Sequence, residues 1–140
     1  MPYITNTEHT PVDVETPRKL GITGVKAWWM LNREAGGAEK IELHVVELAP
    51  GFTHDLHRHP HAGELVYVLE GEGWHLSEDA EPVRQRKGDL TYIPAGEWHG
   101  LANATDEPLV VIGITEGLDN YEDAGYEDHP RVLAEKEQRS

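Results

Sequence analysis

The chain has 140 residues, a length that predicts one domain with a single hydrophobic core. Its 26 acidic and 12 basic residues give a formal net charge of −14, so we expect no nucleic-acid or membrane partner, because such a surface repels phosphates and anionic lipids. Cysteine is absent, which excludes disulfides, thiolate ligands, iron–sulfur clusters and cysteine nucleophiles. The first residues have neither a cationic start nor an apolar run, and no stretch approaches the length of a transmembrane helix. We therefore expect a soluble, cytoplasmic protein without a signal peptide.

The chain divides by pattern into three parts. Residues 1–20 are polar with three prolines and indicate an N-terminal arm. Residues 21–116 contain short runs rich in β-branched and aromatic residues, separated by Gly and Pro turn residues, and this pattern predicts an all-β sandwich or barrel. Residues 117–140 form an acidic C-terminal segment, predicted to lie on the surface, with a short helix from Pro130. The predicted strands are 25–31, 41–48, 64–69, 73–77, 90–93 and 109–115.

Four side chains have the chemistry of a metal site: His57, His59, Glu64 and His99. His57 and His59 are two residues apart, so on an extended strand both leave the same face. Glu64 follows a turn and opens the next predicted strand, while folding must deliver His99 from a distant hairpin. Imidazole suits zinc, copper, iron and nickel, and one carboxylate extends the range toward manganese. The alternative is a metal-free barrel in which the histidines are hydrogen-bonded core residues.

Segments 51–71 and 88–103 resemble the two signature motifs of the cupin superfamily. The first has the form G-X5-H-X-H-X4-E-X6-G and the second G-X5-P-X-G-X2-H-X3-N. Every fixed position is met, by Gly51, His57, His59, Glu64, Gly71, Gly88, Pro94, Gly96, His99 and Asn103. The resemblance implies an all-β double-stranded β-helix, or jelly-roll barrel. It also implies one divalent ion (Fe, Mn, Ni, Zn or Cu) on the three histidines and the glutamate. Because the motif pair occurs once, the chain resembles a single-domain cupin, and homodimers are common in that superfamily.

These ligands favour a metal-dependent enzyme of the non-haem dioxygenase type. Four protein ligands on an octahedral ion leave two positions for substrate, or for substrate and dioxygen. The residual positive charge favours a small anionic or enolisable organic molecule. Two alternatives stay open: a metal-dependent isomerase, lyase or decarboxylase that uses no oxygen, and a non-catalytic barrel that binds or senses a small molecule.

Other polar residues near the motifs are assigned directions from strand parity and loop position. Arg58 lies between two ligands, and strand parity predicts that it points away from the metal. His54 and His61 are expected in loops that flank the ligands and are exposed to solvent; the alternative is that they act as bases beside the metal ligands. The direction of His44 stays open, because it has apolar neighbours on both sides. Two acidic residues either orient a metal-bound histidine or are plain surface charge: Glu47 and Glu97.

The aromatic residues suggest a pocket lining and a partner surface. Trp28 and Trp29 are adjacent, so one should point inward and the other outward. The outward ring suggests a covered surface, which fits a homodimer. Four further aromatic residues either line the pocket or pack in the core or a dimer interface: Tyr67, Trp74, Tyr92 and Trp98.

Overall fold

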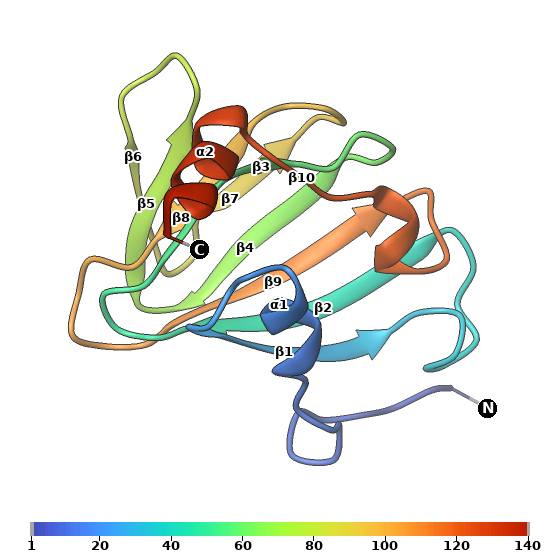
Figure 1. Ribbon diagram of the computed structural model, residues 1–140. Helices are drawn as coiled ribbons and strands as arrows, with labels where there is room; N and C mark the ends of the chain where they lie inside the picture. Colours follow the sequence, from blue (N-terminus) through green and yellow to red (C-terminus); the bar gives the residue numbers. More distant parts are fainter. Residues whose placement is uncertain (1, 140) are drawn as a thin grey trace.

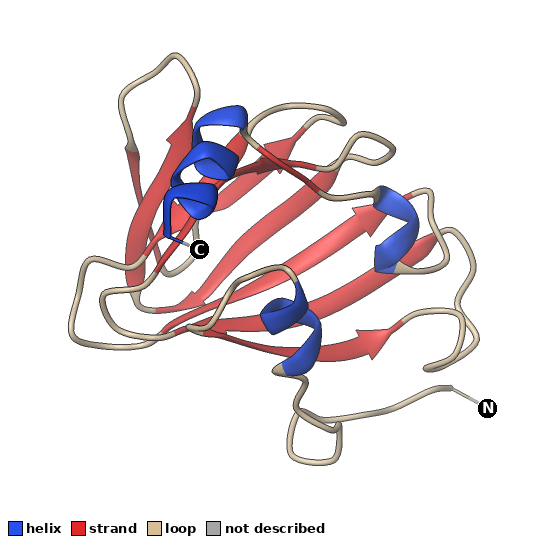
Figure 2. Cartoon of the chain, in the orientation of Figure 1, coloured by secondary structure: helices blue, strands red, loops and turns tan. Residues whose placement is uncertain are grey.

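The computed structural model describes residues 2–139, which form mainly short β-strands (Figures 1 and 2). Within this range the strands are β1 (Val25–Leu31), β2 (Ile41–Leu48), β3 (Thr53–Arg58), β4 (Glu64–Glu70), β5 (Glu72–Ser77), β6 (Val83–Arg86), β7 (Leu90–Ile93), β8 (His99–Ala102), β9 (Leu109–Glu116) and β10 (Glu127–Asp128). All six predicted strands are confirmed, three with the same bounds and three with one residue more at one end. β3, β6, β8 and β10 are additional.

The strands form two five-stranded antiparallel sheets. One has the order β1-β2-β9-β4-β7 and the other the order β10-β3-β8-β5-β6. From β2 to β5 and again from β6 to β10, successive strands alternate between the two sheets, so each sheet is assembled from distant parts of the sequence. This alternation produces the predicted double-stranded β-helix, with its core between the two sheets (Figure 1).

The inner faces of the sheets change from apolar to polar along the barrel. On β2, successive inward side chains are Leu48, Val46, His44 and Glu42, since alternate residues of a strand share one face. At the apolar end, a buried cluster fills the space between the sheets: Ile22, Val25, Leu48, Val68, Leu109 and Val111. Charged side chains are buried only where they have partners. The buried polar side chains at the other end of the barrel therefore indicate a functional site there.

The N-terminal segment contains a packed element that the sequence analysis did not predict. Helix α1 (Glu15–Lys19) follows an isolated bridge between Asp13 and Ala27 of β1. Pro17 is buried, and with Thr16 and Leu20 it lines the interior cavity. The segment therefore does not behave as an arm over its whole length. Figure 1 shows α1 lying over β1 and β2.

The C-terminal segment crosses from one sheet to the other. The short 3₁₀ helix η1 (Tyr121–Ala124) precedes β10, which pairs with β3. The predicted helix after Pro130 is confirmed as α2 (Pro130–Arg139), in which Val132 is buried. Among the helices described for residues 2–139, none is long and apolar enough to cross a membrane.

Candidate metal centre

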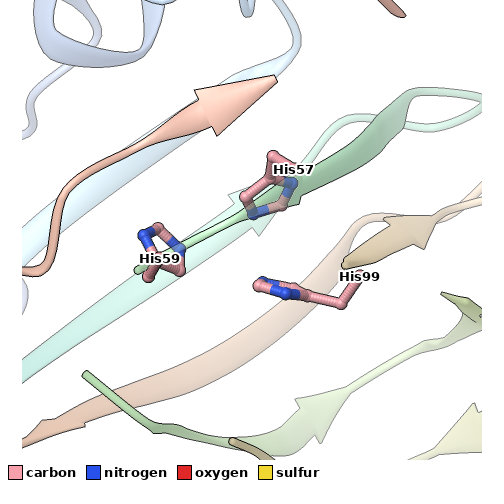
Figure 3. Close-up of side chains that lie close together, drawn as sticks. All are labelled: His57, His59 and His99. Carbon is pink, nitrogen blue, oxygen red and sulfur yellow. The ribbon is translucent and has the colours of Figure 1, made fainter. Parts of the chain in front are cut away.

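Three histidines from two neighbouring strands converge inside the barrel. His57 lies in β3, His59 follows that strand directly, and His99 opens β8. β3 and β8 are paired, and His57 is the register partner of His99. All three side chains are buried, and one nitrogen from each lies within 4.8 Å of the other two. Figure 3 shows the three rings pointing toward a common space.

Main-chain carbonyls fix the orientation of each of these rings. The Nδ1 atoms of His57, His59 and His99 donate hydrogen bonds to the carbonyl oxygens of Asp55, Gly125 and Glu97, at 2.8, 2.7 and 2.9 Å. A carbonyl oxygen can only accept, so the proton of each neutral ring is on Nδ1. Each Nε2 then carries a free lone pair, which is the tautomer that a metal ligand needs.

The environment of His57 and His99 favours the neutral form of imidazole, which is the form that metals bind. Burial lowers the pKa of His57 well below its usual value, and the neighbouring histidines lower it further. Burial also lowers the pKa of His99, although Glu64 and the hydrogen bond to Glu97 oppose the shift. The Nε2 atom of His99 is buried and has no hydrogen-bond partner. An orphaned lone pair inside a protein is costly, and a bound cation would satisfy it.

Glu64, the first residue of β4, lies beside His59 but outside the group of three histidines whose nitrogens lie within 4.8 Å of one another. Its Oε2 atom is 3.7 Å from the Nε2 atom of His59, and its side chain is only 12% exposed. Two donor atoms that each bind one ion at about 2.1 Å are about 3.0–4.2 Å apart in tetrahedral or octahedral geometry. The carboxylate is therefore placed to share an ion with His59.

The second motif positions His99 through its loop. The Gly96 N–H donates to the carbonyl oxygen of His59 at 2.9 Å, which ties the loop before His99 to the first two histidines. Gly96 has a φ of 80°, a conformation in which side chains other than glycine are strained. Asn103 anchors the other end, because its Nδ2 donates to the carbonyl oxygens of Leu48, Ala49 and Glu107.

The histidines open onto a mostly apolar cavity of about 100 Å³ between the sheets. Trp29 lines this cavity, whereas Trp28 is on the outer face of β1, so the adjacent tryptophans point in opposite directions as predicted. The Trp29 Nε1 donates to Asp13 at 2.8 Å, which holds the ring over the cavity. His44, whose direction the sequence left open, also lines it.

Some residues near the histidines differ from the sequence expectations, and others agree with them. His54 is not a solvent-exposed loop residue: its ring stacks on that of His57 with 4.0 Å between centroids. Tyr67, Trp74 and Tyr92 are exposed at the surface and do not line the cavity. Arg58 does point away from the histidines, and its Nε donates to Glu127 at 2.7 Å while the guanidinium lies over Trp98. His61 is exposed, as expected.

The two acidic residues considered as orienting groups have different positions. Glu97 contributes its main-chain carbonyl oxygen to His99, while its own side chain is exposed. The Glu47 carboxylate is 3.8 Å from the Lys26 Nζ on the surface. Main-chain carbonyl oxygens thus orient the histidines. Because every residue has such a carbonyl, the sequence gives no sign of this role.

The acidic segment after β9 supplies aromatic rings that the sequence analysis placed on the surface. The Tyr121 ring contacts that of His59 at 5.4 Å between centroids, and Tyr126 stacks on His57 at 5.0 Å. Burial raises the pKa of the Tyr121 hydroxyl far above its usual value, and nearby carboxylates add to the shift. Because acidic residues and glycines flank both tyrosines, the sequence pattern indicates an exposed segment. Their position beside the histidines is seen only in the folded structure.

Two curated proteins that resemble this chain are much longer than the segment that aligns with it. The chain is 37% identical over 93 residues to gentisate 1,2-dioxygenase of a Streptomyces species, an alignment that covers 65% of this chain and 24% of that protein. It is 30% identical over 102 residues to oxalate decarboxylase of Bacillus subtilis (strain 168), covering 70% of this chain and 26% of the relative. The chain thus spans about a quarter of the length of these two relatives.

A solved structure and a family model agree on the fold. The polyketide cyclase of Streptomyces resistomycificus superposes with a TM-score of 0.74 at 19% identity, covering 89% of this chain and 90% of that one. At this identity the likeness concerns the fold. The family model described as a cupin domain matches residues 44–115, more than half of the chain, including His57, His59, Glu64 and His99. The chain therefore belongs to the cupin family.

Proposed function

We propose that His57, His59, Glu64 and His99 hold one divalent metal ion and that the chain is a metal-dependent enzyme of the non-haem dioxygenase type. The observation that carries this proposal is the common geometry of three buried imidazoles. Each has Nδ1 tied to a carbonyl, and one nitrogen of each ring lies within 4.8 Å of the other two. Similarity to gentisate 1,2-dioxygenase supports the oxygen-using form.

The donor set suits iron, manganese, nickel, zinc or copper. Three neutral imidazoles and one carboxylate leave a divalent ion with a net charge near +1. This charge favours a small anionic or enolisable organic substrate. When bound, the ion would supply Lewis acidity and, with iron, a site for dioxygen.

The chain itself supplies orientation and a dry environment. The carbonyls of Asp55, Gly125 and Glu97 hold the imidazoles in place before any ligand arrives. The apolar walls exclude water, which strengthens electrostatic interactions within the cavity. Trp29 and Tyr121 limit the shape of the molecule that can enter.

Oxygen consumption tests the proposed reaction class. The protein is reconstituted anaerobically with ferrous ion and then given oxygen with short diketones, 2-oxo acids, catechols or hydroxybenzoates. We expect oxygen uptake that requires both iron and substrate and that His99→Ala abolishes. If a broad panel gives no uptake by an iron-loaded protein, the dioxygenase proposal is wrong.

A second candidate uses the same residues without oxygen. Similarity to oxalate decarboxylase supports a decarboxylase, lyase or isomerase in which enolate or carboxylate charge is stabilised. Turnover of a carboxylic-acid panel at equal rates with and without oxygen favours this reaction class. Turnover that stops when oxygen is removed favours the dioxygenase proposal.

We further propose that the chain forms a homodimer through the outer face of the β4–β7 pair. Tyr67 and Leu90 are register partners there, and Tyr92 is two residues along the edge strand. These side chains are 41%, 61% and 50% exposed, so together they form an apolar patch of the kind that a second copy covers. Light scattering after gel filtration should give twice the chain mass, and Leu90→Glu should give the monomer. A wild-type monomer at micromolar concentration would contradict the proposal.

A further inference from the structure

A carboxylate and an imidazole form an isolated buried pair on the inner face of β2. Glu42 is 0% exposed and His44 is 5% exposed. Both carboxylate oxygens of Glu42 lie within hydrogen-bond distance of the His44 Nδ1, at 3.0 and 2.9 Å. This nitrogen therefore donates to Glu42, because a carboxylate only accepts.

The pair favours a positively charged imidazole. Burial alone lowers the pKa of His44, but the hydrogen bond and negative charge of Glu42 outweigh it and raise the pKa above its usual value. Glu64 adds a smaller effect in the same direction. Buried ion pairs stabilise proteins weakly, because desolvation offsets their attraction. Fold stability therefore gives little reason for this pair.

The other ring nitrogen of His44 lies over Gly113 of β9, its register partner. A methyl group at position 113 would lie 2.2 Å from the His44 Nε2, so only glycine leaves room for the ring. The φ of Gly113 is not positive, so the backbone does not require glycine there. Trp29 and Tyr121 contact the same ring at 5.4 and 5.2 Å between centroids.

His44 of this pair lines the same cavity as the candidate metal centre. Tyr121 connects them, since its ring is 5.2 Å from His44 and 5.4 Å from His59. On the sheet, Thr115 is the register partner of both Glu42 and Glu64. Its Oγ1 is buried and has no hydrogen-bond partner. The inner face of β2, β9 and β4 thus presents one buried polar atom, the Thr115 Oγ1, that the fold alone does not satisfy.

We propose that His44 is a second substrate anchor, which donates a hydrogen bond from Nε2 to an oxygen of a ligand bound at the metal centre. Glu42 is the positioning residue that holds the ring, and Gly113 provides its space. The inference rests on the proposed metal site and specifies its substrate. The preferred ligand carries two anionic or carbonyl oxygen groups, one for the ion and one for His44.

The size of the cavity narrows this class. An engineered cavity of about 150 Å³ accommodates benzene. The cavity here is about 100 Å³, so it suits a compact acid rather than a large ring system. A short dicarboxylate or 2-oxo acid places two oxygen groups within that space.

Malonate and propionate, a dicarboxylate and a monocarboxylate of equal chain length, test the inference. Their affinities are measured by calorimetry on manganese-loaded protein whose metal content is checked first. Wild type should bind malonate more tightly than propionate. His44→Gln should lower malonate affinity about 10-fold or more, since a charged donor is lost, and should change propionate affinity little. Gly113→Ala should act in the same direction by displacing the ring.

Two controls separate positioning from general damage. His61→Gln removes an exposed histidine outside the cavity and should leave both affinities unchanged. In ¹⁵N spectra recorded across a pH titration, Glu42→Gln should lower the pH at which the His44 ring loses its second proton, because the negative charge that raises the pKa of His44 is removed. This second readout needs no metal.

The outcomes are distinguishable. A metal-loaded wild type without preference for malonate contradicts the inference, and so does a metal-loaded His44→Gln variant that retains the preference. Either result leaves the metal site standing. A protein that binds no metal under any condition overturns the proposed function and this inference with it.

Discussion

At the scale of single residues, the account depends on lone pairs directed by backbone carbonyls. His59→Ala removes one donor and should reduce metal affinity by more than the roughly 10–100-fold that loss of an outer hydrogen-bond partner costs. Plasma emission spectrometry of dialysed protein measures the retained metal. His61→Ala is the matched control, since that side chain is exposed and only two positions away. Equal metal retention by the two variants would contradict the role of His59.

The Glu42–His44 pair makes a second prediction at this scale. His44→Leu leaves the buried carboxylate without its hydrogen-bond donor and should lower the free energy of unfolding by about 3–5 kcal/mol. The double variant Glu42→Leu, His44→Leu removes both charges and should be more stable than His44→Leu alone. Urea denaturation measures both. Additive losses in the double variant would mean that the two residues do not form a pair.

The sequence predicts the residue types of the site but not its surroundings. The motif spacing identifies His57, His59, Glu64 and His99, because metal ligands are particular residue types that can be recognised in a sequence. The carbonyl of Gly125, which orients His59, is invisible to such a pattern, since every residue has one. Tyr121 is hidden for another reason: its segment reads as acidic surface, and only the return of the chain across the barrel brings it to His59.

At the scale of elements, the loop between β8 and β9 depends on one amide. Asn103 is 1% exposed and donates to three carbonyl oxygens, while its own Oδ1 accepts from the Thr105 main chain. Asn103→Ala should lower the free energy of unfolding by about 2–3 kcal/mol, because buried acceptors lose their donor. Asp106→Ala, an exposed change in the same loop, should have little effect. Equal effects of the two changes would show that Asn103 is not an anchor.

Strands with clear alternation or β-branched runs could be predicted, whereas short polar ones could not. β2 and β9 consist largely of apolar residues and were assigned from composition alone. β6 has the sequence VRQR and β8 the sequence HGLA, neither of which favours a strand by itself. They become strands because β5 lies between them and supplies both with hydrogen-bond partners.

At the scale of the whole molecule, the buried histidines make the metal-free protein sensitive to acid. Burial lowers the pKa of His54 to about 3, and the pKa values of His57 and His99 are also lowered. Below pH 6.5 the unfolded chain binds protons that the folded chain does not, so stability falls with decreasing pH. His54 should contribute to this loss over the range from pH 6.5 down to about 3.

His44 does not offset this loss. Its pKa is raised, so its contribution is fully present below pH 6.5 and is lost only as the pH rises through the folded-state value. Urea denaturation of metal-free protein at pH 6.0 and 5.0 measures the slope in the range where the contribution of His44 is constant. His54→Phe keeps a ring stacked on His57 but cannot titrate, and it should show a shallower slope. A wild-type slope near zero would mean that these histidines are not buried in the neutral form.

The proposed metal centre requires that the two sheets bring four metal-binding side chains from distant parts of the sequence together inside the barrel. Anomalous X-ray diffraction from crystals of protein produced with iron and manganese, recorded at the absorption edges of both metals, tests this most directly. The account predicts one anomalous peak between the Nε2 atoms of His57, His59 and His99 and the Glu64 carboxylate, at about 2.0–2.3 Å from each. No peak there in metal-supplemented crystals, or a peak that contacts none of these four side chains, would contradict it.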